Sequence, residues 1–587
     1  MKKSGILSLA LAFCALFSLL LLVSCSQDGE KVPLPAREED SLVICGGRED
    51  YVILLKREQS NEYKECVNAL LTAFEQQLGK KPETRILTED TEINEGSKVV
   101  LFGDLGTDHP AEEYAKGIID GPGFAVCVVG ETLALYADSD SRLADLTRLF
   151  AEKYVKNENG KMLIDRSIYL MRQFDPYTGD GFDQLDPALP VIEIKTANGK
   201  QIGSKEKYVS AAVSVSNVYM EHRLYKESAQ VKGRGNGSWK YSGDNKPLRI
   251  KFDSKQNLLG AGGGNSRDWE LLSNPFDYTQ LRNAIAFTLG REVFTEVGYT
   301  TDFRYAHVFV SGVYKGIYLV CDRVEISSHK IDIDEDPENV RSDYLIQLDS
   351  YAHYGEAGNI TEGVDFFRME DKCWVIESDH NSAERCEHVR RRFEIIFSAI
   401  RSGDPEKIAK YVDLDSCVDM YLLHEYCKNT DAGWSSFYVV LTKDSKLYFT
   451  APWDFDLSSG NDIRVDNGSY EGIHAGELDD PALSNPIFYL LTEQDFFKRL
   501  VCERWSELSR DAFDTALSLI DTYSGEYRGE FIYDCMKNYP AESVHKFSDA
   551  DDGETVYTDN LKYLRSWYIN RTKWMNGYFS QLPKEGI

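Results

Sequence analysis

The sequence is poor in positive charge. Its 587 residues include 66 Lys and Arg against 96 Asp and Glu, which gives a net charge of −30 at pH 7. Nucleic acids and anionic membrane surfaces are bound through clustered Lys and Arg side chains. The charge balance therefore argues against a nucleic-acid-binding protein.

Several catalytic and metal-binding patterns are missing as well. The chain contains no HExxH, no GxSxG and no CxxC. These patterns carry the ligands of zinc peptidases, the nucleophile of serine hydrolases and the thiolates of zinc and redox sites, so the sequence gives those classes little support. A glycosidase stays open, because its two carboxylates are defined by geometry rather than by spacing.

Long apolar runs are absent except at the start. Met1-Lys2-Lys3 followed by an apolar run to Val23 is typical of a signal peptide, and an uncleaved membrane anchor is the alternative. The ending Leu22-Val23-Ser24-Cys25 resembles the bacterial lipobox. That resemblance implies a signal peptide over 1–24, a lipid on Cys25 and attachment to the outer face of a bacterial membrane. Residues 25–40 are polar and Pro-containing, which predicts a tether.

Cysteine is sparse and scattered. Of the 12 cysteines, those beyond Cys25 sit mostly among apolar neighbours, as Cys127 does in FAVCVV and Cys321 in YLVC. This setting predicts buried free thiols and leaves any disulfide connectivity undefined.

The chain divides into a small and a large part. Residues 41–171 alternate strand-like segments such as KVVLFGD and TLALYAD with two amphipathic helices, which predicts a small α/β domain. This part resembles the accessory domain that precedes the catalytic barrel of some carbohydrate-active enzymes, and it carries no convergent set of acids, His or Cys. We expect it to serve recognition or spacing. A Pro-, Gly- and Asp-containing linker over 172–190 leads to a larger domain over 191–587.

A basic segment opens the larger domain. KGRGNGSWKYSGDNKPLRIKF, residues 232–252, concentrates Lys and Arg in an otherwise acidic chain. Its glycines let backbone N–H groups approach a phosphate. Strand alternation places Arg249 and Lys251 on one face of a strand, as a phosphate clamp requires. The candidate phosphate ligands are Arg234, Lys246, Arg249 and Lys251, and a solvated basic loop is the alternative.

The segment from Asp415 to Gly460 predicts a helix, a loop, a hairpin and an acidic turn. Asp431 lies in the loop, and the hairpin turns at Lys443-Asp444-Ser445. Asp454 follows 23 residues after Asp431, with Asp456 one aromatic residue further on. This layout can aim several carboxylates at one point, so that one accepts a proton from a hydroxyl while the others hold Mg²⁺. An acidic surface turn after an ordinary hairpin is the alternative.

Several segments together resemble the CotH kinase family, a group of atypical protein kinases. The resemblance covers roughly residues 190–580 and rests on KGRGNGSW (232–239), KPLRIKF (246–252), DWELLSNPFDYTQLRNAIAFTLGRE (268–292), GVYKGIYLVCDRVEI (312–326), YLIQLD (344–349) and PWDFDLSSG (452–460).

The resemblance implies an α+β, kinase-like domain with a helical C-terminal subdomain. It further implies transfer of the γ-phosphate of ATP, with Mg²⁺ or Mn²⁺, to Ser or Thr of a protein at the cell surface. Asp431 would orient or deprotonate the acceptor hydroxyl, while Asp454 and Asp456 would hold the metal. A second metal ligand a few residues after Asp431 would have to be Ser436, or the site would hold a single metal. A surface adhesion or glycan-binding protein without catalysis stays open.

Overall fold

The structure is a computed structural model. It describes residues 41–88, 91–94, 96–119, 123–166, 168–173, 189–218, 222–354, 360–462, 468–477, 483–538, 548, 550 and 552–582. The signal peptide, Cys25 and the tether, which the sequence predicts over residues 1–40, lie outside the described residues. The chain forms two compact units. The first comprises the described residues up to Ile168 apart from Ala115–Val126, and the second comprises Ala115–Val126 and the residues from Tyr169 onward.

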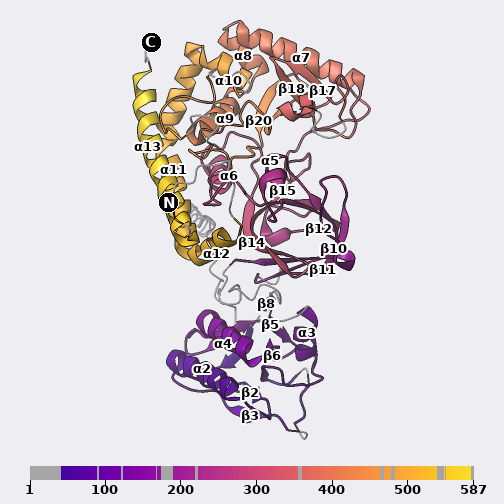
Figure 1. Cartoon of the computed structure of the whole chain (residues 1–587), viewed down its shortest axis with the longest axis vertical. Coiled ribbons are helices and arrows are strands. Elements are labelled where there is room, and N and C mark those ends of the chain that lie inside the picture. The colour runs from indigo at the N-terminus through magenta and orange to yellow at the C-terminus, as the bar shows by residue number, and fades with distance from the viewer. Residues whose placement is uncertain are drawn as a thin grey trace, which may run out of the picture. The chain divides into compact units, whose positions relative to one another are not determined.

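The N-terminal part is built on a 6-stranded sheet in the order β3-β2-β4-β6-β5-β8, with a 2-stranded sheet of β1 and β7 (Figure 1). The elements are β1 (Ser41–Cys45), β2 (Val52–Leu55), α2 (Asn61–Leu78), β3 (Thr84–Ile86), β4 (Val99–Phe102), α3 (Pro110–Ile118), β5 (Gly123–Val129), β6 (Thr132–Ala137), α4 (Asp140–Tyr154), β7 (Met162–Asp165) and β8 (Tyr169–Gln173). Helix α2 begins at a Ser60 cap and ends at Gly79, whose φ of 72° suits glycine. Its buried residues Tyr63, Cys66, Leu70 and Phe74 recur at three- and four-residue steps.

The second unit begins with a closed barrel. Its strands run in the order β10-β11-β12-β13-β15-β14-β9, and β9 closes the ring by pairing with β10. The elements are β9 (Val191–Thr196), β10 (Val209–Ser216), β11 (Leu224–Gly233), α5 (Gly237–Tyr241), β12 (Leu248–Gln256), β13 (Ser266–Leu272), α6 (Arg282–Glu292), β14 (Phe303–Val310) and β15 (Val313–Asp322). Alternate residues of the strands point inward, so that Val231, Ile250 and Trp269 meet in the barrel core.

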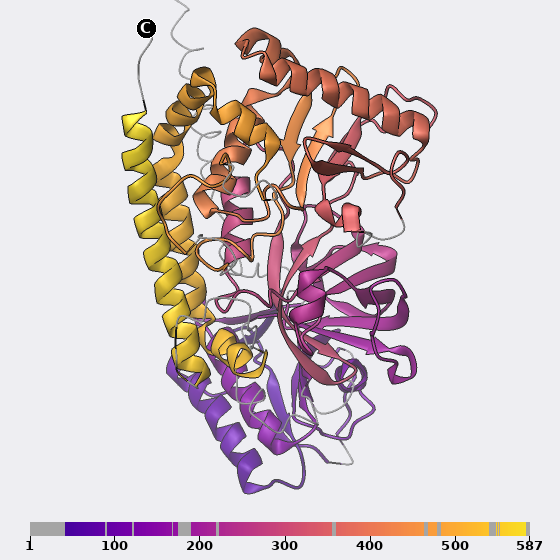
Figure 2. The same cartoon turned by 45° about the horizontal axis from the view of Figure 1, so that its top comes forward.

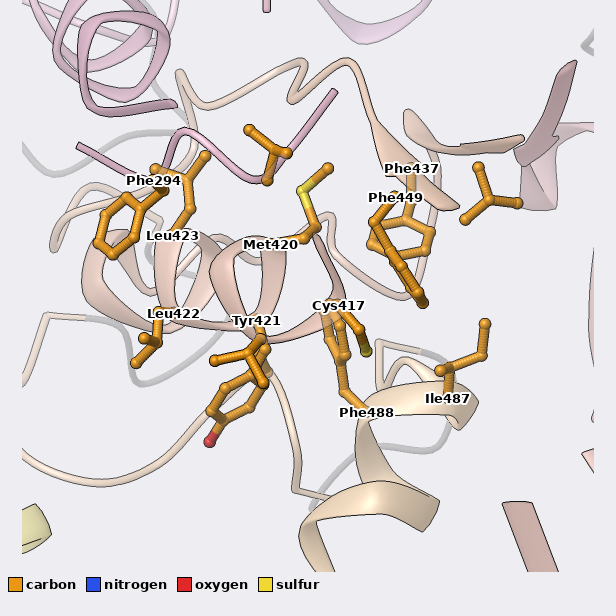
Figure 3. Packing of buried hydrophobic residues seen from close by; sticks show 14 of the residues in the cluster. Phe294, Cys417, Met420, Tyr421, Leu422, Leu423, Phe437, Phe449, Ile487 and Phe488 are labelled. Atoms are coloured by element: carbon orange, nitrogen blue, oxygen red, sulfur yellow. The ribbon is translucent and has the colours of Figure 1, made fainter. Parts of the chain in front are cut away.

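A 5-stranded antiparallel sheet follows, in the order β17-β18-β16-β19-β20. The elements are β16 (Tyr344–Leu348), β17 (Phe366–Met369), β18 (Lys372–Ile376), α7 (Ala383–Arg401), α8 (Pro405–Tyr411), α9 (Leu414–Cys427), β19 (Phe437–Leu441) and β20 (Leu447–Thr450). Helix α9 is buried on all sides from Ser416 to Cys427, and most of its residues are apolar. Figure 3 shows its side chains leaving on opposite faces, Met420 and Leu423 on one side and Tyr421 and Leu422 on the other.

The chain ends in helices α10 (Pro486–Thr492), α11 (Asp495–Glu526), α12 (Arg528–Asn538) and α13 (Gly553–Gln581). The long helices α11 and α13 lie side by side, as both whole-chain views show (Figure 2). Trp505 of α11 and Trp567 of α13 belong to the same core as α9. Helix α12 packs against β15 of the barrel. The helical tail therefore holds the barrel and the core around α9 together.

The α+β class predicted from the sequence is confirmed. The two strands predicted around Lys443-Asp444-Ser445 are β19 and β20, paired from Tyr438↔Thr450 to Leu441↔Leu447. The described cysteines are free, and apart from Cys502 they are buried, as predicted. In the described part of the chain, no helix is long and apolar enough to cross a membrane.

The segment over residues 275–294 is only partly helical. The apolar period predicts a helix over residues 275–294, but α6 begins only at Arg282. The residues before it form buried turns, in which Asn274 and Gln280 take positive φ values of 43° and 63°. The Asp277 side chain accepts hydrogen bonds from the backbone N–H groups of Thr279 and Arg282. These local bonds replace the first helical turns.

Candidate active site

Three acids predicted from the sequence meet after folding. Asp431 lies in the loop after α9, and Asp454 and Asp456 lie in the turn after β20. Burial and the charges of Asp454 and Asp431 raise the pKa of Asp456 well above its usual value. Burial also raises the pKa of Asp454, against the opposing effects of Arg234 and of a hydrogen bond from Ser436. The hairpin of β19 and β20 thus brings the loop that carries Asp431 close to the turn that carries Asp454 and Asp456.

Ser436, the predicted replacement for a second metal ligand, sits beside this group. Its hydroxyl Oγ donates to Oδ2 of Asp454 over 3.3 Å. Ser436 directly precedes β19, and Asp454 follows β20, so the two residues face each other at the open end of the hairpin. The pairing of β19 with β20 therefore sets the distance between them.

The turn that carries Asp454 and Asp456 is held by hydrogen bonds between its backbone and asparagine side chains. The N–H of Phe455 donates to Oδ1 of Asn283 over 2.7 Å, and Nδ2 of Asn461 donates to the carbonyl of Asp456 over 2.6 Å. Asp454 itself takes a positive φ of 65°. Because that backbone region is costly for a residue other than glycine, the surrounding hydrogen bonds fix the direction of its side chain.

A fourth acid belongs to the site and was missed in the sequence. Asp349 directly follows β16, and its pKa is raised to about 6 by burial, with the charges of Glu377 and Asp454 adding to the effect. Its Oδ1 accepts from the N–H of Tyr351 over 3.0 Å. The charges of Asp431 and Asp454 likewise contribute to a pKa of about 12 for Tyr351, whose main cause is burial. The signal was available in the YLIQLD segment, which ends in this acid.

The candidate phosphate ligands are spread over the barrel. Arg234 and Arg249 both bind Glu270 of β13, at 2.8 Å and 2.7 Å. Glu270 is 1% exposed, so this double pairing neutralises a buried charge. Arg234 also lies 5.9 Å from the ring of Trp453, next to Asp454. Of the predicted cations, Arg234 therefore lies beside the residue that precedes Asp454 and lowers the pKa of Asp454, and Arg249 is joined to it through Glu270.

Lys246 and Lys251 are placed differently. Nζ of Lys246 donates to the carbonyl of Trp239 in α5 over 2.6 Å, which anchors this short helix. Lys251 is exposed on the outer face of β12 and pairs in register with Gln230 and Asp268. The predicted strand alternation is correct, since Arg249 and Lys251 share the outer face while Leu248 and Ile250 point inward. No contact described for these two lysines links them to the acids.

Arg323 is a cation that the sequence analysis did not single out. It follows β15 outside the basic segment, so no local charge cluster marks it. Arg323 and Arg249 oppose the effect of burial on the pKa of Glu377, and Arg323 and Arg234 do the same for Tyr438. The charges of three arginines, Arg323 after β15, Arg249 in β12 and Arg234 after β11, therefore act on Glu377 and Tyr438 of the second sheet.

The acids suit a metal ion whose remaining coordination positions are filled by a bound ligand. Among the described residues, no group of three or more His, Cys, Asp or Glu side chains forms a ready-made metal site. Mg²⁺ commonly uses one or two carboxylates together with phosphate oxygens and water. Asp454 and Asp456 supply two carboxylates whose mutual repulsion a cation would relieve. This donor set suits a metal that arrives with a nucleotide.

Comparison with protein families decides the assignment. The family model described as CotH kinase protein matches residues 231–575, more than half of the chain. The chain belongs to the CotH kinase family. The matched region of this CotH protein begins in β11, ends within α13, and includes Arg234, Asp349 and the three predicted acids. No curated protein matches the sequence.

Proposed function

We propose that this CotH family protein is an atypical kinase that transfers the γ-phosphate of ATP to a Ser or Thr hydroxyl of a surface protein. The observation that carries the proposal is the convergence of Asp431, Asp454 and Asp456 opposite Arg234. A phosphoryl transfer site needs this combination of acids for metal and acceptor with cations for phosphate.

Each group has a place in the reaction. Asp431 orients the acceptor hydroxyl and accepts its proton. Arg234 lies beside Trp453 and lowers the pKa of Asp454, which makes it the candidate for the transferring phosphate. Arg249 and Arg323 are candidates for the remaining phosphates. Glu270 holds Arg234 and Arg249 in place between turnovers. Asp454 and Asp456 would hold Mg²⁺, which supplies charge neutralisation at the phosphate oxygens when bound.

The proposed location is the outer face of a bacterial membrane, with a lipid on Cys25. The sequence of residues 1–40 supports this, with its basic start, apolar run and LVSC ending. Metabolic labelling with a fatty acid in a bacterial host should mark the wild-type protein and not Cys25→Ser. A labelled Cys25→Ser protein would contradict the anchor.

The proposed kinase is tested by calorimetric titration of residues 26–587 with ATP, with and without Mg²⁺. We expect binding that depends on the metal and is lost in Asp454→Asn. Asp444→Asn is the matched control, because Asp444 is an exposed acid in the β19–β20 turn. Absence of binding by the wild-type protein at millimolar ATP would overturn the proposal.

A glycan-binding protein without catalysis is the second candidate, and one observation favours it. Tyr354 stacks on Trp434 with ring centroids 6.1 Å apart, and Tyr351 meets Trp434 edge-on at 6.0 Å. Tyr354 is 61% exposed. Exposed aromatic faces beside carboxylates suit the apolar face and the hydroxyls of a sugar. A glycan array should then show binding that Trp434→Ala loses and Asp454→Asn keeps.

A further inference from the structure

A continuous line of buried side-chain amides connects helix α12 to the acidic turn. Nε2 of Gln280 donates to Oδ2 of Asp534 over 3.1 Å, and Nδ2 of Asn274 donates to Oε1 of Gln280 over 3.0 Å. Nδ2 of Asn283 donates to Oδ1 of Asn274 over 2.9 Å, and Oδ1 of Asn283 accepts from the N–H of Phe455 over 2.7 Å. All five residues are buried. We call this line the amide relay.

The two ends of the amide relay fix its direction. The carboxylate of Asp534 can only accept, while the backbone N–H of Phe455 can only donate. Each of the three amides between them must therefore turn its NH₂ group toward Asp534 and its oxygen toward Phe455. A side chain in α12 thus dictates which atom faces the backbone between Asp454 and Asp456.

Asp534 is itself held firmly. Besides Gln280, its Oδ1 accepts from the N–H of Ile317 over 2.9 Å and from Nδ2 of Asn538 over 2.8 Å. Three donors on a buried carboxylate are worth more than hydrogen bonds between neutral groups. The relay therefore starts from a carboxylate that is bonded to strand β15 of the barrel.

We propose that Asp534 is a positioning residue, which sets the conformation of the acidic turn through the amide relay. The proposal rests on the proposed function, because it assigns a supporting residue to the same site. Asp534 touches neither Asp454 nor Asp456 through any described hydrogen bond, so its effect has to travel through Gln280, Asn274 and Asn283.

Asp534→Asn makes two hydrogen-bond donors of the relay face each other, without changing the size of the side chain. Its oxygen keeps the donors Ile317 and Asn538, so its new NH₂ group faces the NH₂ group of Gln280. Each amide can relieve the mismatch by turning over, which passes it to the next one. The mismatch ends at the N–H of Phe455, which cannot turn over.

The first measurement is hydrogen exchange at the amide of Phe455. We expect exchange at least tenfold faster in Asp534→Asn than in the wild-type protein. Asn538→Ala is the matched control, because it removes a hydrogen bond from the same carboxylate without turning any amide. We expect the control to exchange within threefold of the wild-type rate.

The double variant Gln280→Glu with Asp534→Asn should restore the relay. The carboxylate introduced at position 280 accepts from Asn274 and from the amide introduced at position 534, so the amides beyond it keep their original direction. We expect exchange at Phe455 to return to within threefold of the wild-type rate. Should Asp534→Asn alone fail to fold, a folded double variant with wild-type exchange supports the relay, and an unfolded double variant overturns it.

The second measurement is the Mg²⁺ concentration that gives half-maximal phosphate transfer. It should rise at least tenfold in Asp534→Asn, stay unchanged in Asn538→Ala and recover in the double variant. Equal behaviour of Asp534→Asn and Asn538→Ala in exchange would overturn the relay. If the wild-type protein neither binds Mg·ATP nor transfers phosphate, the kinase proposal fails, while exchange at Phe455 still decides the relay.

Discussion

Arg282 and Asp277 form a buried ion pair next to the turn that carries Asp454 and Asp456. Nη1 of Arg282 lies 2.5 Å from Oδ1 of Asp277, and each side chain is 1% exposed. Nε of Arg282 also donates to the carbonyl of Ser458 over 2.9 Å. The pair therefore ties the start of α6 to the chain just beyond Asp456, whose pKa the Asp277 charge also raises.

Arg282→Met should destabilise the protein strongly. The substitution leaves Asp277 as a buried charge without its partner, which costs about 3–5 kcal/mol of unfolding free energy. Urea unfolding measures the loss. The control is Arg291→Met, whose partner Asp302 lies 2.6 Å away but whose side chain is 34% exposed. It should lose less than about 1 kcal/mol. Similar losses of unfolding free energy in both variants would contradict the burial of the Arg282–Asp277 ion pair.

Asp431→Asn should separate binding from transfer. Asn keeps the shape of Asp431 but cannot accept a proton from the acceptor hydroxyl, a role worth about 10²–10⁴-fold in rate. We expect the turnover number to fall by about that factor while Mg·ATP affinity stays within about threefold. Asp444→Asn, an exposed acid of the hairpin turn, should leave both unchanged. Loss of binding in Asp431→Asn would instead make it a ligand-holding residue.

The hairpin and its acids could be predicted because their signals are local. Alternating apolar residues and the turn at Lys443-Asp444-Ser445 define β19 and β20, and chain continuity then brings Asp454 near Ser436. Asp349 was marked only by its place at the end of the YLIQLD segment, and Arg323 by no local signal. Asp349 directly follows β16 and Arg323 directly follows β15, and the packing of the barrel against the second sheet brings their charges to the site.

The hydrogen bonds that support the acidic turn could not be predicted from the sequence either. Gln280 lies within residues 275–294, whose apolar spacing predicts a helix, and Asn274 directly precedes them, yet both take positive φ values. The side chain of Asn274 bonds with Asn283, and that of Gln280 bonds with Asp534, which lies more than 250 residues further along the chain. Tertiary hydrogen bonds overrode the local propensity at this point.

Gly433→Ala should disturb the loop that carries Asp431. A methyl group at Gly433 would overlap backbone atoms of Leu483 and Ser484, which cannot rotate away. We expect a loss of about 1–3 kcal/mol in unfolding free energy and a lower turnover number. In Gly577→Ala of α13 the added methyl meets open space. That control should gain about 0.5–1 kcal/mol because alanine favours a helix. An unchanged Gly433→Ala protein would show that the loop can move.

His424 should make the fold sensitive to acid. Burial between Phe437, Phe455 and Phe488 lowers the pKa of His424 to about 3, and the charge of His474 adds to this effect. Between that value and the ordinary pKa of about 6.5, the unfolded chain binds a proton that the folded protein does not. The unfolding free energy therefore falls as the pH drops below about 6.5.

The expected contribution of this histidine is measurable. Between about pH 7.5 and pH 5.5, the wild-type protein should lose about 1.4 kcal/mol more unfolding free energy than His424→Gln. Urea unfolding at both pH values gives the difference. His353→Gln replaces an exposed histidine and should keep the full wild-type loss. If His424→Gln loses as much stability on acidification as the wild-type protein, His424 is protonated in the folded state, and its ring cannot be a neutral packing partner of Phe455.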